Sequence, residues 1–136
     1  MAEQSGRHEP VYLTLEDIRE LFAAIIDGSP ADASNQLRSS DGLAGALGRP
    51  ATHAHYEDAD LSLQAAVLAH GIAETQPFID GNKRIALVAM LTFLEINGIR
   101  LQASDPELAA WIISLSAGST PEDLADKIRG VAQRAR

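Results

Sequence analysis

Residues 76–84 bring together side chains that suit the binding of a phosphate group and its metal ion. The stretch reads Gln-Pro-Phe-Ile-Asp-Gly-Asn-Lys-Arg and leads into a long apolar segment that favours a helix. A helix N-terminus carries free backbone N–H groups and a partial positive charge, and phosphates bind there readily. The sequence therefore predicts an anion site where this loop enters the helix.

Each polar residue of this stretch has its own expected role at such a site. Asp80 supplies a carboxylate for Mg²⁺, which is usually held by one or two carboxylates together with phosphate oxygens. Gly81 lets the backbone approach a ligand closely, and the amide of Asn82 can donate a hydrogen bond. Lys83 adds a point charge and Arg84 a planar fork of donors, both suited to phosphate. The same composition is also typical of a capped, charged start to a core helix, so the residues alone leave both interpretations open.

Composition narrows the class of protein and the kinds of partner. The chain has 136 residues, enough for one domain with a hydrophobic core, and 46% of them are hydrophobic. Its net charge of −8 argues against direct binding of nucleic acid, which normally requires a basic surface. The chain has no cysteine, so disulfides and thiolate metal sites are excluded. No apolar run approaches the roughly 18 residues of a membrane span, and the N-terminus lacks the apolar centre of a signal peptide. We expect a cytoplasmic protein that does not bind a membrane.

Helical periodicity runs through most of the chain and predicts an all-α fold. The segment 81–96 is apolar on nearly every side, which is typical of a helix surrounded by others, and Asp80 is a suitable N-cap for it. We expect a compact bundle of about six helices around this buried central helix. The bundle forms a single domain of residues 11–136, preceded by a polar tail of residues 1–10.

The stretch from residue 28 to residue 58 is less regular than the rest of the chain. Ser40 or Asp41 can cap a short helix, which Gly48 and Pro50 are expected to stop. Residues 99–102 are expected to be extended. Other helices are expected to begin at Thr14, at Asp58 or Asp60, at Asp105 and at Thr120.

The histidines outside the phosphate stretch are candidates for other chemistry. His53 and His55 alternate in a predicted polar connector, where a metal pair would lack further fixed ligands, so a solvated loop is the preferred interpretation. His70 lies on an apolar helix, where a histidine is more often a satisfied core residue than a catalyst. His8 lies in the polar tail and has no expected role.

The stretch 77–84, its apolar helix and the segment 93–98 together closely resemble the Fic/Doc superfamily. The family pattern is His, any residue, Phe, any residue, Asp, Gly or Ala, Asn, Lys and Arg, in that order. Relatives of the Fic type have a glycine at the place of Lys83 and a second arginine at the place of Leu87, so this chain looks like the Doc (death-on-curing) branch. Residues 37–50 also resemble Doc, where the equivalent stretch leads to the flap that aligns the protein substrate.

This resemblance implies an activity, cofactors and partners. Doc toxins transfer the γ-phosphate of ATP to a threonine of a translation elongation factor, whereas Fic relatives transfer AMP. A small antitoxin neutralises Doc toxins by folding its C-terminal segment into a groove on the helical surface. In both branches the motif histidine is the general base and the Asp holds Mg²⁺. Carried over to this chain, the site consists of the Mg²⁺ ligand Asp80, the anion hole of Gly81 and Asn82, the phosphate cations Lys83 and Arg84, and the buried anchor Phe78.

The chain departs from this pattern where Gln76 occupies the place of the motif histidine. An amide has no usable proton affinity near neutral pH, and the loss of a general base typically costs on the order of 10²–10⁴ in rate. Three explanations stay open: the glutamine is engineered to silence a toxic protein, it is natural in a pseudoenzyme, or another base such as His70 replaces the histidine. We expect a phosphotransferase that is inactive or weakened as found. The alternatives are a catalytically dead protein that binds a nucleotide or a partner, and an adenylyltransferase.

Overall fold

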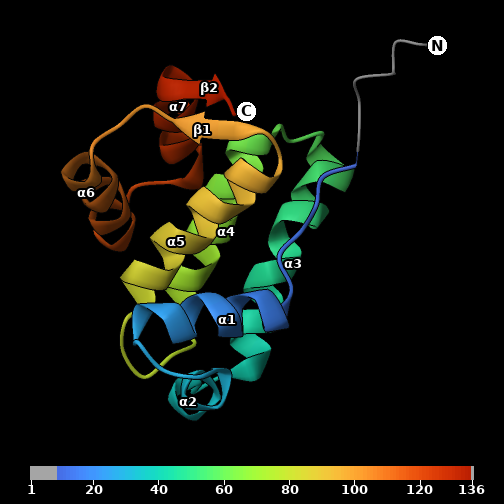
Figure 1. Ribbon diagram of the computed structural model, residues 1–136. Helices are drawn as coiled ribbons and strands as arrows, with labels where there is room; N and C mark the ends of the chain where they lie inside the picture. Colours follow the sequence, from blue (N-terminus) through green and yellow to red (C-terminus); the bar gives the residue numbers. More distant parts are fainter. Residues whose placement is uncertain (1–8, 136) are drawn as a thin grey trace.

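The computed structural model describes residues 9–135 and contains seven α-helices and two short β-strands within that range (Figure 1). Of the predicted polar tail, residues 1–8, which include His8, lie outside the described residues. No helix in the described part of the chain is long and apolar enough to cross a membrane. The elements are α1 (Leu15–Ile25), α2 (Pro30–Gln36), α3 (Ser40–Glu57), α4 (Leu61–Thr75), α5 (Asn82–Ile96), β1 (Ile99–Leu101), α6 (Asp105–Ser116), α7 (Pro121–Val131) and β2 (Ala132–Arg134).

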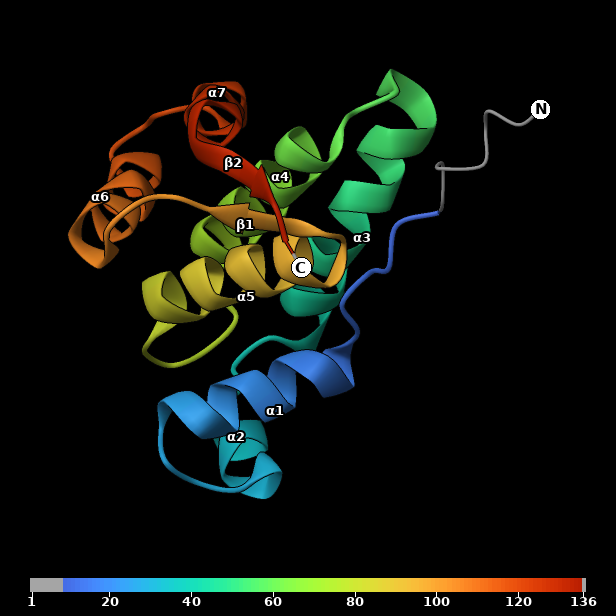
Figure 2. The ribbon, with the colours of Figure 1, turned by 45° about the horizontal axis from the view of Figure 1, so that its top comes forward.

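Helices α4 and α5 run side by side through the middle of the molecule, with α1 and α2 on one side and α6 and α7 on the other (Figure 1, Figure 2). Helix α4 contacts α3, α5, α6 and α7, and nine of its fifteen residues are buried. In α5, the predicted central helix, six of fifteen residues are buried. The predicted all-α fold is confirmed, and the two helices share the central position.

Six of the seven helices in the described range begin at a residue whose side chain accepts a hydrogen bond from a backbone N–H of the first turn. Such caps satisfy N–H groups that have no partner inside the helix. The predicted caps at three of these positions are confirmed, and α6 begins with a cap one residue earlier than predicted. The six caps are Thr14, Ser29, Ser39, Asp60, Ser104 and Thr120.

Helix α3 corrects the prediction of a short helix followed by a polar connector. It continues through both Gly48 and Pro50, and it ends only at Asp58, whose φ of 54° is left-handed. A proline in a helix interior costs about 3 kcal/mol, but the Pro50 side chain is buried in the packed face of the helix, which offsets part of this cost. His53 and His55 therefore lie on the last turns of a helix.

Two short elements, α2 and β2, are absent from the sequence prediction. Helix α2 begins with a capping box in which Ser29 and Asp32 bond each other's backbone N–H groups. Strand β2 follows α7 directly and pairs antiparallel with β1, so that Ile99 lies opposite Arg134. The predicted extended segment at β1 is confirmed, whereas the basic end of the chain forms its partner strand instead of a helix terminus.

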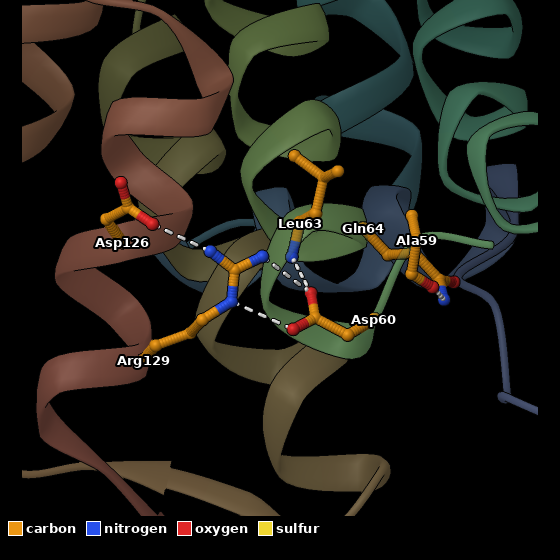
Figure 3. A network of polar contacts seen from close by, with 6 residues as sticks. All are labelled: Ala59, Asp60, Leu63, Gln64, Asp126 and Arg129. Carbon is orange, nitrogen blue, oxygen red and sulfur yellow. Dashed lines mark hydrogen bonds and ion pairs between the residues drawn. The ribbon is translucent and has the colours of Figure 1, made fainter. Parts of the chain in front are cut away.

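An ion pair ties α7 to the start of α4 (Figure 3). Arg129 donates from Nε and Nη2 to the two carboxylate oxygens of Asp60, at 2.8 and 3.0 Å, and from Nη1 to Asp126 at 2.8 Å. Asp60 also accepts the backbone N–H of Leu63 and so caps α4. The hydrogen bonds from Arg129 lower the pKa of the Asp60 carboxyl below its ordinary value.

Candidate functional site

The loop between α4 and α5 turns sharply at both of its ends. Gln76, the C-cap of α4, has φ 47° and ψ 60°, and its N–H donates to the carbonyl of Ile72 at 3.0 Å. Gly81, the N-cap of α5, has φ 80°. A left-handed conformation is open to glycine but costs a residue with a side chain on the order of 1–3 kcal/mol. Gln76 persists in it because the surrounding contacts fix the loop.

Phe78 anchors the loop in the core. Its side chain is 0% exposed, and its ring stacks on that of Phe22 from α1 with the centroids 3.9 Å apart. Below the loop, Phe22 also limits the space at Gly81, where an added Cβ would lie 3.3 Å from its Cε1 atom. The aromatic pair therefore fixes the position of the loop against the core.

Asn82 closes the loop from the other end. Its Oδ1 accepts the N–H of Phe78 and its Nδ2 donates to the carbonyl of Phe78, both at 2.9 Å. One N–H of the amide remains for a ligand, because the group has two. The residue predicted to bind phosphate thus also fixes the turn that presents the other candidates.

The connection between α2 and α3 holds the far side of the loop. The N–H groups of Arg38 and Ser39 donate to the carbonyl of Pro77 at 2.7 and 3.0 Å, and the N–H of Ile79 donates to the carbonyl of Gln36 at 2.8 Å. Backbone hydrogen bonds thus join residues 36–39 to residues 77–79. This explains how an exposed loop keeps one shape.

The N-terminus of α5 is open. It is the one helix start in the described range without a side-chain cap, since its N-cap is Gly81. Asp80, the predicted cap, does not cap the helix, because its Oδ1 accepts the N–H of the adjacent Gly81 at 2.8 Å. The first N–H groups of α5 and the helix dipole consequently face solvent together with the exposed side chains of Lys83 and Arg84. Neither cation forms a salt bridge with any residue between positions 9 and 135.

These residues surround a hollow of about 390 Å³. It is mostly polar, and Ser116 at the end of α6 also lines it. Phe78 is not among its lining residues, since it lies in the core beneath. The lining residues are Ala73, Gln76, Ile79, Asp80, Gly81, Asn82, Lys83, Arg84 and Ser116.

A second hollow, of about 290 Å³, continues the first past Gln76. The two share Ala73, Gln76 and Ser116, and the second also reaches His70 and Glu74 on α4. His70 therefore lies in the space next to the position that lacks a histidine. The remaining lining residues of the second hollow are Leu115 and Gly118.

A third hollow, of about 500 Å³, lies between α3, α4 and α7 and contains none of the motif residues. His53 lines it and also pairs with Glu57 at 3.2 Å, while His55 packs edge-on against Tyr56. No group of three or more His, Asp or Glu side chains that could hold a metal occurs in the described residues. The geometry therefore gives the histidines of α3 no metal site of their own.

A divalent ion at the first hollow would have one protein carboxylate, that of Asp80. With one oxygen of this carboxylate held by the N–H of Gly81, the residues present do not form a complete metal cage. They fit Mg²⁺ in the way the ion usually meets a nucleotide, through one or two carboxylates, phosphate oxygens and water. Metal binding at this site would thus depend on a phosphate ligand.

The motif residues are predictable from the sequence, whereas the contacts that complete the site come from other parts of the chain. Ser116 lines the hollow from α6, Phe22 supports the loop from α1, and Arg38 bonds the loop from the α2–α3 connection. Neither the resemblance of the segment 37–50 to Doc nor the helical spacing that includes Phe22 predicts a contact with the loop. Only the packing of the helices brings them to residues 76–84.

Comparison with known proteins gives two agreeing matches. The family model described as the Fic/DOC family matches residues 12–94. The chain is also 41% identical over 94 residues to a protein named Toxin Doc from Mycolicibacterium smegmatis (strain ATCC 700084 / mc(2)155), and the match covers 68% of each chain. Both matched regions contain the loop and the open start of α5.

Proposed function

Because the chain belongs to the Fic/DOC family, we propose that it is a Doc-like toxin of a toxin–antitoxin module whose hollow at α5 binds ATP with Mg²⁺. The reaction is transfer of the γ-phosphate to a hydroxyl of a translation elongation factor. In the chain as found, this transfer is absent or weak, because Gln76 stands where the base belongs. The partner in the module is an antitoxin protein.

The observation that carries this proposal is the open N-terminus of α5. In every other helix of the described range, a capping side chain accepts a hydrogen bond from an N–H of the first turn. In α5 no side chain does so, and the first N–H groups stay free beside Lys83 and Arg84. Backbone N–H groups, a helix dipole and two cations without salt bridges to described residues form a suitable environment for a polyphosphate. The hollow of about 390 Å³ gives that phosphate chain room.

The residues around the hollow have distinct roles in this proposal. Gly81 starts α5 without a side-chain cap, so the first backbone N–H groups of the helix and the free N–H of the Asn82 amide bind the transferred phosphate. Lys83 and Arg84 neutralise its charge. Asp80 holds the Mg²⁺ ion, which, when bound, withdraws charge from the phosphate oxygens. The hydroxyl oxygen of the target attacks the γ-phosphorus as the bond to the β–γ bridging oxygen breaks, so that ADP leaves. The hydroxyl proton needs an acceptor at position 76.

Gln76 cannot accept the hydroxyl proton, but a basic side chain at position 76 would be well placed to do so. The side chain lines the hollow at its junction with the second hollow, beside the place of the phosphate. The left-handed backbone at this position is one that histidine adopts more readily than most residues. A histidine introduced here thus needs no change of the loop.

The test is to restore the base. The variant Gln76→His and the chain as found are incubated with Mg²⁺ and elongation factor Tu, with radioactive ATP labelled either in the γ- or in the α-phosphate. We expect Gln76→His to transfer the γ-label faster by on the order of 10²–10⁴. Transfer of the α-label would instead identify an adenylyltransferase, and no transfer of either label by Gln76→His would exclude the phosphotransferase. The double variant Gln76→His/Lys83→Ala is the control for an activity that does not arise at this site.

A second function is favoured by Gln76 itself. Its amide can hydrogen-bond a phosphate or hydroxyl but takes up no proton, which suits a protein that binds a nucleotide without reacting. This function predicts that ATP with Mg²⁺ raises the melting temperature of the chain as found, with no modified product. The increase in melting temperature should disappear in Lys83→Ala. It should persist in the control Lys127→Ala, because Lys127 is an exposed lysine of α7 that does not line the hollow. No increase with any nucleotide would argue against both functions.

A further inference from the structure

We propose that Arg38, which lies outside the motif, is a positioning residue that holds position 76 over the phosphate site. This inference rests on the function proposed above, because the group to be positioned is the one that faces the target hydroxyl. It assigns a role in that reaction to the α2–α3 connection, which contributes no side chain to either hollow beside Gln76.

The contact that carries the inference is a hydrogen bond from the Nη2 atom of Arg38 to the carbonyl oxygen of Gln76, at 2.7 Å. It spans 38 positions in the sequence and joins two elements that the chain does not connect locally. The Arg38 side chain has no salt bridge to a described residue, so no carboxylate between positions 9 and 135 competes for the guanidinium. A charged donor makes a stronger hydrogen bond to a carbonyl than a neutral one.

Gln76 is a residue at which such a restraint matters. It has a left-handed backbone, which residues with side chains rarely adopt, and it links the end of α4 to the loop. Its N–H is held by Ile72, but its carbonyl has no hydrogen bond in the described range except that from Arg38. The hydrogen bond from the N–H to Ile72 holds one side of the Gln76 Cα atom, and the bond from Arg38 to the carbonyl holds the other side. Together the two bonds fix the backbone angles of Gln76, and with them the direction in which its Cα–Cβ bond leaves the loop.

The backbone of Arg38 makes a separate contribution to the same loop. Its N–H and that of Ser39 donate to the carbonyl of Pro77, and these bonds survive any change of the Arg38 side chain. Phe78 also stays stacked on Phe22. Arg38→Ala therefore removes the restraint on position 76 while the rest of the loop keeps its supports.

The experiment compares variants in the Gln76→His background. A misplacement of about 1 Å at a reacting group can cost roughly 100-fold in rate. We expect Arg38→Ala to lower kcat for phosphate transfer by about 10- to 100-fold while the KM for ATP changes by less than about twofold. Arg38→Lys, which keeps one charged donor, should recover part of kcat. The control Arg100→Ala removes an exposed arginine of β1 and should leave both constants unchanged.

Two results would overturn the inference. One is a kcat for Arg38→Ala equal to that for Arg100→Ala. The other is an equal loss in kcat and in ATP affinity accompanied by a lower melting temperature, which would show that Arg38 only stabilises the fold.

A second measurement decides the matter if Gln76→His transfers no phosphate and the proposed reaction itself fails. It uses hydrogen exchange of the Gln76 amide in the chain as found. Loss of one hydrogen bond to the turn should speed this exchange by about 3- to 10-fold in Arg38→Ala and not in Arg100→Ala. Unchanged exchange in Arg38→Ala would show that the guanidinium does not hold position 76.

Discussion

The ring of Phe78 lies flat on the ring of Phe22, with a centroid separation of 3.9 Å and an angle of 7° between the planes. Phe78 belongs to the motif loop and Phe22 to α1, so the pair connects the candidate site to the helix layer beneath it. The edge of the Phe22 ring also comes within 3.3 Å of the place where a Cβ of Gly81 would stand. One side chain of α1 thereby limits two positions of the loop.

Gly81→Ala should weaken nucleotide binding as well as the fold. The φ of 80° costs alanine about 1–2 kcal/mol, and the added methyl group must push either the loop or the Phe22 ring. We expect a lower free energy of unfolding in urea and a smaller rise in melting temperature with ATP and Mg²⁺. The matched control is Gly98→Ala, where φ is 89° but no atom lies within 4 Å of the added Cβ. Equal loss of the ATP effect in both variants would contradict a local role for Gly81.

Asn82→Ala should lose both the closure of the loop and a phosphate ligand. Its amide makes two hydrogen bonds to the backbone of Phe78, and without them the N–H of Phe78 and its carbonyl, both part-buried, lose these partners. Each such group costs about 1–3 kcal/mol, so we expect destabilisation of this order and loss of the thermal shift with ATP.

The control for Asn82→Ala is a second asparagine with the same type of contacts. Asn97 bonds the N–H and the carbonyl of Val11 and the carbonyl of Phe93, at the other end of α5. Asn97→Ala should lower the melting temperature to a similar degree and leave the ATP-induced shift intact. If it abolishes the shift as well, the effect of Asn82→Ala reflects general instability.

The motif and most of the helices could be predicted because their signals are local. A capping residue followed by a proline and an acidic residue predicts the start of α7 at Thr120. The same pattern at Ser29-Pro30 would have predicted α2. The predicted stop at Pro50 is wrong because part of its cost of about 3 kcal/mol is offset by burial of the side chain, which sequence alone does not reveal. Local stop signals therefore fail where the tertiary packing of a face outweighs them.

The candidate site was predicted as a list of residues but not as a geometry. Asp80 was expected to cap α5, yet the cap is Gly81, and the helix start is open for this reason. Phe22 and Ser116 could not be predicted, since each reaches the loop from a different part of the chain. Arg38 lies in the segment 37–50 that resembles Doc, but its contact with the loop was not predicted. The chemistry of the motif is local, whereas its support depends on the whole bundle.

Tyr12→Phe should destabilise the start of the domain by leaving a buried group without a partner. The Tyr12 hydroxyl donates to Oε1 of Gln64 at 2.9 Å, and Gln64 is only 3% exposed. Its Nε2 is already used by the carbonyl of Ala59, so rotation of the amide cannot compensate (Figure 3). We expect the free energy of unfolding in urea to fall by about 1–3 kcal/mol. The ring of the introduced phenylalanine should still stack on Phe93, as the Tyr12 ring does. A stability equal to that of the unaltered chain would mean that water replaces the hydroxyl.

Asp60→Asn should reduce stability more at neutral pH than in acid. The hydrogen bonds from Arg129 lower the pKa of Asp60 below its ordinary value of 3.8, so the charged form stabilises the fold above this pH. The contribution is lost as the pH falls through the lowered pKa. Because the Asp60 side chain is 54% exposed, we expect a loss of less than about 1 kcal/mol at pH 7. Because asparagine can still cap α4, the difference between the two proteins reports the effect of the Asp60 charge alone.

The measurement is urea unfolding of both proteins at pH 7 and near pH 3, at low salt. The difference between the unaltered chain and Asp60→Asn should be present at pH 7 and should shrink below pH 3.8, where the unfolded chain takes up a proton at this carboxyl and the folded chain, with its lowered pKa, resists protonation. Asp126→Asn is the comparison, since Asp126 meets Arg129 through one hydrogen bond and is 78% exposed, and its effect should be smaller. A difference that is the same at both pH values would show that the ion pair between α4 and α7 adds no stability beyond the cap.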